Sequence, residues 1–130
     1  MPTWVEFLNT SRANCTVVRA RRCQSFLCRA RGLMFRRHLD SKSGLLLMEP
    51  TESRSGTSIH MFFVFIALGV AWLDADLRVV DTTIARPWRV YWPSGPARFV
   101  LEGEPSMIES LAVGDQLKAI DVESKEPLPL

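Results

Sequence analysis

Apolar and polar residues alternate over short stretches along most of this chain, and turn-forming residues separate these stretches. Such stretches, rich in β-branched and aromatic residues, are typical of β-strands. The pattern predicts six to eight short strands: VEFLN (5–9), CTVVRA (15–20), GLLLMEP (44–50), two strands within 59–73, one over 78–85, one over 97–102, and VGDQLKAID (113–121).

Two segments predict short helices instead. In SFLCRARGLMFR (25–36), Ser25 suits an N-cap, Phe26 and Ala30 fall on one face, and Gly32 suits the residue after the helix end. PSMIESL (105–111) begins with a proline, which favours the first helical turn. The strands do not alternate with helices, so the pattern indicates an α+β fold with a mostly antiparallel sheet and two short helices. The length of 130 residues predicts a single domain, which we place at 1–122, followed by a flexible tail at 123–130.

The segment SIHMFFVFIALGVAWLD (58–74) is apolar enough to raise the question of a membrane span. No charged residue occurs from Ser55 to Leu73, but the apolar run proper is Met61–Leu73, thirteen residues. A helix that spans a bilayer needs about 20 apolar residues, and runs of about 10–14 more often belong to a soluble core. The phenylalanines also favour strand over helix. We therefore predict two central core strands here, with a break near residues 67–69 and the phenylalanines buried.

Composition narrows the class of protein further. The net charge of +2 argues against bulk nucleic-acid binding, although residues 1–38 hold eight arginines against one acid. Three cysteines, Cys15, Cys23 and Cys28, form no C-x-x-C pair, which predicts free thiols in a reducing compartment and no metal site. The first fifteen residues lack the pattern of a signal peptide. We therefore expect a cytoplasmic protein with no membrane span, no metal and no cofactor.

Six motifs in order carry a resemblance to a known family. They are RARGLMFR (29–36), GLLL (44–47), IHMFFVFIALGVAWLDADLRVV (59–80), RPWR (86–89), GPARFVLE (95–102) and VGDQL (113–117). Together, over about residues 12–121, they resemble the prokaryotic domain of unknown function 192. The resemblance implies a β-rich, partly barrel-like α+β fold, and the function of that family is unassigned.

Three positions depart from the pattern of the family that the chain resembles. This chain has Phe65 where the family carries a basic or polar residue, Ala67 where it carries proline, and Gly69 where it carries aspartate. If the basic residue and the aspartate interact when partly buried, losing both can be nearly neutral, whereas losing one strands a charge. This hypothesis predicts that Phe65→Arg alone is strongly destabilising.

The candidate binding residues are basic and aromatic. His60 lies on an apolar segment, where a lone histidine is more often structural than catalytic, and no nucleophile has a spacing that pairs with it. In RPWRVYW (86–92), Arg86, Trp88 and Arg89 combine guanidinium groups with a flat ring, which suits carbohydrate, phosphate or peptide recognition. The alternative is that the tryptophans cap the core and the arginines are solvated. Arg29 and Arg31 would complete an anion site if they lay near His60, which the sequence cannot show.

Three function classes stay open on this basis. The first is a non-enzymatic module that binds a small anionic or carbohydrate ligand, or a protein partner, through an arginine–aromatic surface. The second is an enzyme or accessory enzyme domain that acts on an anionic or carbohydrate substrate. The third is a family member whose polar site has decayed. The absence of a catalytic motif favours the first class.

Overall fold

The computed structural model describes residues 3–23 and 42–130. In this part of the chain, strands account for 53% of the structure and helical residues for 8%, so the fold is mostly β. The elements, in chain order, are β1 (Trp4–Asn9), the 3-10 helix η1 (Thr10–Arg12), β2 (Cys15–Cys23), β3 (Ser43–Ser53), β4 (Ile59–His60), β5 (Leu68–Leu73), β6 (Val79–Ala85), β7 (Val90–Tyr91), β8 (Ala97–Gly103), the 3-10 helix η2 (Pro105–Ser110) and β9 (Leu117–Asp121).

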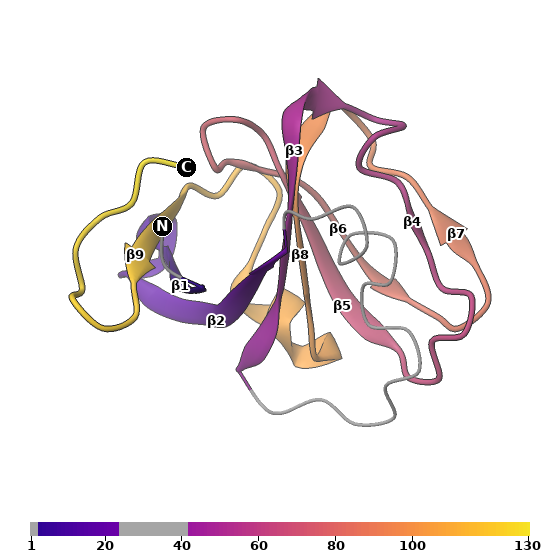
Figure 1. The fold of residues 1–130 in the computed structure, drawn as a ribbon, viewed down its shortest axis with the longest axis horizontal. Coiled ribbons are helices and arrows are strands. Elements are labelled where there is room, and N and C mark those ends of the chain that lie inside the picture. The colour runs from indigo at the N-terminus through magenta and orange to yellow at the C-terminus, as the bar shows by residue number, and fades with distance from the viewer. Residues whose placement is uncertain (1–2, 24–41) are drawn as a thin grey trace.

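Seven of these strands form one sheet in the order β6-β5-β8-β3-β2-β1-β9. All neighbours are antiparallel except β2 and β3, which pair in parallel from Arg19↔Ser43 to Cys23↔Leu47. The remaining two strands, β4 and β7, pair with each other as a separate two-stranded sheet. Figure 1 shows this small sheet at the end of the molecule opposite the two termini. We call it the arm.

The large sheet curls until its two edges approach one another. The turn before β9 bonds to the start of β6: the Val79 amide donates to the Asp115 carbonyl, and the Gly114 amide donates to the Val79 carbonyl. The fully buried Asn9 ties a third element to this seam, because its Nδ2 donates to Asp115 Oδ2 and to the Ser110 carbonyl at the end of η2. The partly barrel-like curvature follows from this closure.

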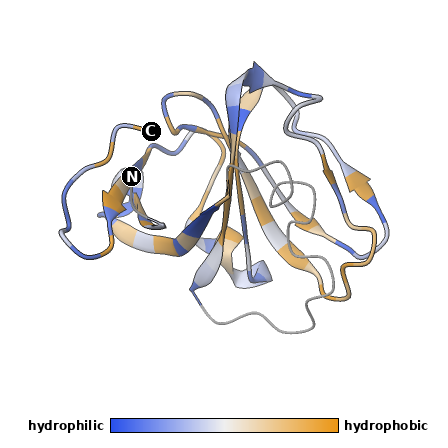
Figure 2. Cartoon of the chain, viewed as in Figure 1, coloured by the Kyte–Doolittle hydropathy of each residue, from blue (hydrophilic) through white to orange (hydrophobic). Residues whose placement is uncertain are grey.

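The curled sheet packs apolar side chains on both faces of its central strands. Ala71 and Leu73 of β5 join the cluster inside the curl, whereas Val70 and Trp72 of the same strand join a second cluster outside it. β5 is therefore buried at all six positions, and Figure 2 shows its apolar character. The outer cluster also contains Ile59 and Met61 from the arm, so the arm covers the outer face of the sheet.

The prediction of an α+β fold with two short helices is wrong. The segment predicted at 105–111 forms only a 3-10 helix of six residues, η2, which is too short to build an α-helical layer. The helix predicted at 25–36 lies outside the described residues. The described chain therefore consists of strands joined by turns, as a mostly-β fold requires.

The apolar segment 59–73 is divided earlier than the sequence indicated. β4 ends at His60 and β5 begins at Leu68. The residues between them form no strand, and only some of them are buried. Phe62, Phe63 and Phe65 are 43%, 46% and 42% exposed, which corrects the prediction that the phenylalanines are buried. The physical reason is that the outer cluster receives Met61, Val64 and Leu68 from this segment, and the three exposed phenylalanines fall between them.

One other strand boundary differs from expectation, whereas the flexibility of the tail stays a prediction. β3 continues through Pro50 to Ser53, beyond the strand end that the proline suggested. The residues predicted to be a flexible tail make contacts with the sheet: the Leu128 amide donates to the Ala119 carbonyl, and Leu128 and Leu130 pack against the inner cluster.

Gly69, on β5, is a position where a side chain cannot fit. A Cβ added there would lie 2.4 Å from the backbone carbonyl oxygen of Glu104. We expect Gly69→Ala to lower the free energy of unfolding by about 1–3 kcal/mol, because β5 and the backbone at Glu104, just after β8, must separate locally. Urea denaturation measures this loss. The control is Gly95→Ala, whose nearest contact would be Val80 Cγ1 at 3.6 Å; an equal loss in both variants would contradict the assignment.

Candidate functional site

The arm is fixed to the sheet through Met61. Its amide donates to the Arg89 carbonyl and its carbonyl accepts from the Trp88 amide, each at 2.7 Å. Its side chain is only 1% exposed and belongs to the outer cluster. A second anchor lies just before β4, where the Trp72 indole donates to the Thr57 carbonyl at 2.7 Å. The Met61 side chain and the Trp72 indole therefore attach the arm to the sheet, and the Met61 backbone joins the two halves of the arm.

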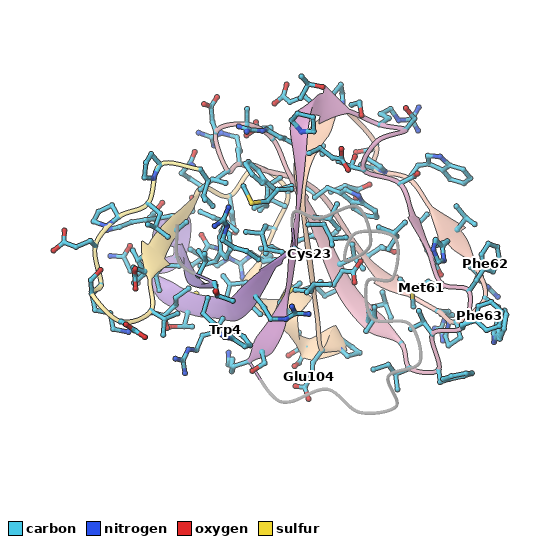
Figure 3. All side chains as sticks on the ribbon, in the orientation of Figure 1. Trp4, Cys23, Met61, Phe62, Phe63 and Glu104 are labelled. Carbon is cyan, nitrogen blue, oxygen red and sulfur yellow. The ribbon has the colours of Figure 1, made fainter. Side chains whose placement is uncertain are left out.

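Beyond Met61, three aromatic rings pack against one another in solvent. The Phe63 ring meets the Trp88 ring edge-on with centroids 5.1 Å apart, and the Phe62 and Trp88 centroids are 6.4 Å apart. Trp88 is 53% exposed, the most open of the three. Figure 3 shows Phe62 and Phe63 at the outer margin of the molecule, with Met61 on the side toward the sheet. We call Phe62, Phe63 and Trp88 the aromatic tip.

Two residues of the aromatic tip have strained backbones. Phe63 has φ +60° and Trp88 has φ +68°, values in the left-handed region that bulky L-residues rarely adopt. Each such residue costs about 1–2 kcal/mol relative to ordinary backbone. Strain of this kind persists where the surrounding structure holds it, and it gathers at functional sites. Here the two strained residues touch each other.

The structure brings three of the candidate residues together on the arm. His60 stacks on Phe62 with ring centroids 5.4 Å apart, and its Nδ1 accepts from the Phe62 amide at 3.3 Å. Trp88 belongs to the aromatic tip, and Arg89 follows it with an exposed side chain. Arg86 lies at the base of the arm, where its amide donates to the Tyr91 hydroxyl at 2.8 Å. Arg29 and Arg31 lie outside the described residues.

The exposed arginines of the arm have no carboxylate beside them in the described part of the chain. The ion pairs recorded there, Arg12 with Asp115 and Lys125 with Glu6, belong to residues far from the arm in sequence. Residues 54–73 and 82–101 contain no aspartate or glutamate at all. The arm is therefore cationic as well as aromatic.

A separate cavity of about 1080 Å³ lies away from the arm. Its described lining includes Trp4, Arg19 and Ser43 with two acids, Asp121 and Glu123. No local sequence pattern indicates this cavity, because its described walls come from four segments far apart in the chain. None of the candidate residues belongs to its described lining.

Cysteine chemistry differs from the expectation of three free thiols. Cys15 is a free thiol, but Cys23 is disulfide-bonded, so the prediction is wrong for Cys23. Cys28 lies outside the described residues. The argument from free thiols to a reducing compartment loses part of its support, and cytoplasmic localisation stays a prediction.

No helix in the described residues has the length and apolarity needed to cross a membrane. Within the same ranges, no group of three or more His, Cys, Asp or Glu side chains is placed to hold a metal ion.

Comparison with known proteins identifies the family. The family DUF192, described as an uncharacterized ACR, matches residues 7–119. The chain belongs to the DUF192 family. A UPF0127 protein of Pyrococcus horikoshii is 41% identical over 96 residues, covering 72% of this chain and 81% of that protein. A UPF0127 protein of Pyrococcus furiosus is 35% identical over 113 residues, covering 85% and 95%.

Solved structures agree on the fold. A crystal structure from Sinorhizobium meliloti, described as a candidate transcription regulator, superimposes with a TM-score of 0.77 at 19% identity, covering 89% of this chain and 92% of that one. A protein of unknown function from Novosphingobium aromaticivorans superimposes with a TM-score of 0.72 at 23% identity, covering 88% and 82%. At these identities the likeness shows the fold alone.

The structure changes how the DUF192 departures are interpreted. Phe65 is 42% exposed, so an arginine there would keep its charge in solvent, and the predicted strong destabilisation by Phe65→Arg does not follow. Gly69 is buried against the Glu104 backbone, where an aspartate would need more room than this chain provides. The two positions therefore differ in burial and do not form a buried pair in this protein.

Glu102 is a carboxyl group that the sequence analysis missed. It is 5% exposed on β8, and its cross-strand neighbours Leu45 and Val70 are apolar. Burial raises the pKa of Glu102 from 4.5 to about 7. The sequence signal for Glu102 is that it is the lone acid in the strand ARFVLEG. Because side chains two residues apart in a strand lie on the same face, Glu102 shares the face of Val100, a residue of the outer cluster.

The strain at Trp88 predicts an unusual response to glycine. Trp88→Gly removes the left-handed penalty but also loses the ring contacts, worth about 0.5–1.5 kcal/mol, so we expect the free energy of unfolding to change by less than about 1 kcal/mol. Trp4→Gly is the control, because Trp4 is similarly exposed but lies in extended β1, where glycine costs about 0.5–1 kcal/mol in addition to lost contacts. If urea denaturation shows that Trp88→Gly lowers the free energy of unfolding more than Trp4→Gly does, the assignment of strain to Trp88 is wrong.

The raised pKa of Glu102 predicts a pH dependence of stability. Because the folded pKa of about 7 exceeds the unfolded value of 4.5, the folded state holds this proton more tightly. The contribution of Glu102 to the free energy of unfolding is therefore greatest below pH 4.5. It falls by up to about 3 kcal/mol as the pH rises to 7. Urea denaturation across this window measures the slope. Glu102→Gln, which stays neutral, should flatten it, and an unchanged slope would show that another group is responsible.

Proposed function

We propose that this DUF192 protein is a non-enzymatic binding module whose arm recognises an anionic partner. The observation that supports this proposal most directly is the aromatic tip with its strained backbone. Phe63 and Trp88 combine left-handed backbone conformations with rings that are 46% and 53% exposed. A surface kept in this form against its conformational cost is typical of a recognition site.

The charges beside the tip indicate the chemistry of the partner. Arg86 and Arg89 are exposed within the acid-free ranges 54–73 and 82–101, so their guanidinium groups are available to bind an anion. Guanidinium groups bind phosphate and carboxylate with paired hydrogen bonds, and flat rings beside them add apolar contact.

A second function has one observation in its favour. Glu102, with a pKa of about 7, has the proton affinity that a general acid or base needs at neutral pH. Glu102 is 5% exposed and does not belong to the described lining of the 1080 Å³ cavity, so this second function has less support than the first. The decayed-site alternative loses support, because Phe65 and Gly69 are not a matched buried pair.

Binding of small phosphates tests the proposed function. Isothermal titration calorimetry with tripolyphosphate and with inositol hexakisphosphate should detect binding to the wild type. Arg86→Ala combined with Arg89→Ala should lower the affinity about tenfold or more. The control is Arg19→Ala with Lys118→Ala, which removes the same charge from exposed positions outside the arm. Equal weakening by both pairs, or no binding to the wild type, would contradict the proposal.

A further inference from the structure

The exposed apolar side chains of this protein are concentrated on one part of the chain. In the described residues, eight large hydrophobic side chains are exposed, and six of them fall between residues 62 and 92: Phe62, Phe63, Phe65, Trp88, Val90 and Trp92. Single exposed hydrophobic residues are ordinary on a protein surface, but a cluster of this kind marks an interaction site. The other two, Trp4 and Val113, lie outside this range.

The cluster projects rather than lining a hollow. Phe62 and Phe63 lie at the margin of the molecule, at the opposite end from the termini (Figures 1 and 3). The aromatic tip comes from residues just beyond the short strands β4 and β7, which pair only over Ile59↔Tyr91 and His60↔Val90. A projecting tip can enter a soft, planar partner, whereas a small ligand or a single nucleic-acid strand is held in a groove.

The arrangement of rings and charges matches the lipid–water interface. Aromatic rings are favoured at the level of the lipid headgroups, and basic side chains nearby are attracted to anionic lipid by about 1 kcal/mol each. Arg89 follows Trp88 directly and is exposed, and the acid-free ranges 54–73 and 82–101 remove the repulsion that a carboxylate would add. Local charge matters here, because the net charge of the whole chain is only +2.

We infer that the arm docks this protein onto an anionic lipid surface, with Phe62, Phe63 and Trp88 entering the headgroup region while Arg86 and Arg89 contact lipid phosphates. This inference deepens the proposed function and rests on it. The fixed backbone at Met61 presents the rings before contact, so no ordering of the arm is needed on binding. The protein lies on the membrane and does not span it.

Vesicle co-sedimentation tests this inference. The full chain should bind vesicles of phosphatidylcholine with about 30% phosphatidylglycerol and bind pure phosphatidylcholine at least about tenfold more weakly. Phe62→Ser with Phe63→Ser, and separately Trp88→Gly, should each weaken binding about tenfold or more. Trp4→Ser is the matched control, because Trp4 and Phe62 are both 43% exposed. Circular dichroism and urea denaturation confirm that the variants fold.

Depth of insertion gives a second measurement. Phosphatidylglycerol vesicles that carry brominated chains quench the fluorescence of tryptophans that enter the bilayer. We expect quenching in the wild type that Trp88→Phe reduces and Trp4→Phe does not. Equal quenching in all three proteins would overturn the assignment of Trp88 to the interface.

The possible results separate this inference from the function it rests on. Arginine-dependent binding to tripolyphosphate without binding to anionic vesicles overturns the lipid inference and leaves the proposed function standing. Binding to neither overturns both. If sedimentation velocity shows a dimer that Phe62→Ser with Phe63→Ser abolishes, and vesicles do not compete with it, the tip contacts a second copy and the lipid inference fails.

Discussion

The position of Met61 is the constraint on which the candidate site depends. Its side chain is buried in the outer cluster, and its backbone amide and carbonyl bond to Arg89 and Trp88, the two residues just before β7. A residue fixed at three points leaves its neighbours little freedom, so the next two side chains, Phe62 and Phe63, must point away from the sheet. The same bonds hold Trp88 in its left-handed conformation opposite them. Burial of one methionine thus determines the exposure of three aromatic rings.

That burial is a consequence of the sheet. Because the sheet curls until the turn before β9 reaches β6, the inner cluster is closed off and the central strands still have a second apolar face outside. The arm covers part of this outer face with Ile59 and Met61. Apolar residues of the same segment beyond what this face can accept remain in solvent. The aromatic tip is therefore exposed because its segment carries more apolar residues than the outer face of the sheet can bury.

The two chemically notable features of the molecule differ in their surroundings. The arm is exposed, cationic and aromatic, whereas Glu102 is buried between Leu45 and Val70 on the outer face. A carboxyl group kept neutral by burial is compatible with the apolar cluster around it and does not require a catalytic role. The exposed rings and strained backbone of the arm, by contrast, reduce stability in the isolated protein.

The sequence by itself determined several of the strands, because strand-forming runs and turn residues are local properties: the strands at 5–9, 78–85 and 97–102 were all predictable. It also identified His60, Arg86, Trp88 and Arg89 as chemically distinctive. Only the tertiary structure decided which apolar residues are buried, because that depends on how many faces the sheet presents. For this reason the phenylalanines predicted for the core lie outside it, and Glu102, a charged residue type, lies inside.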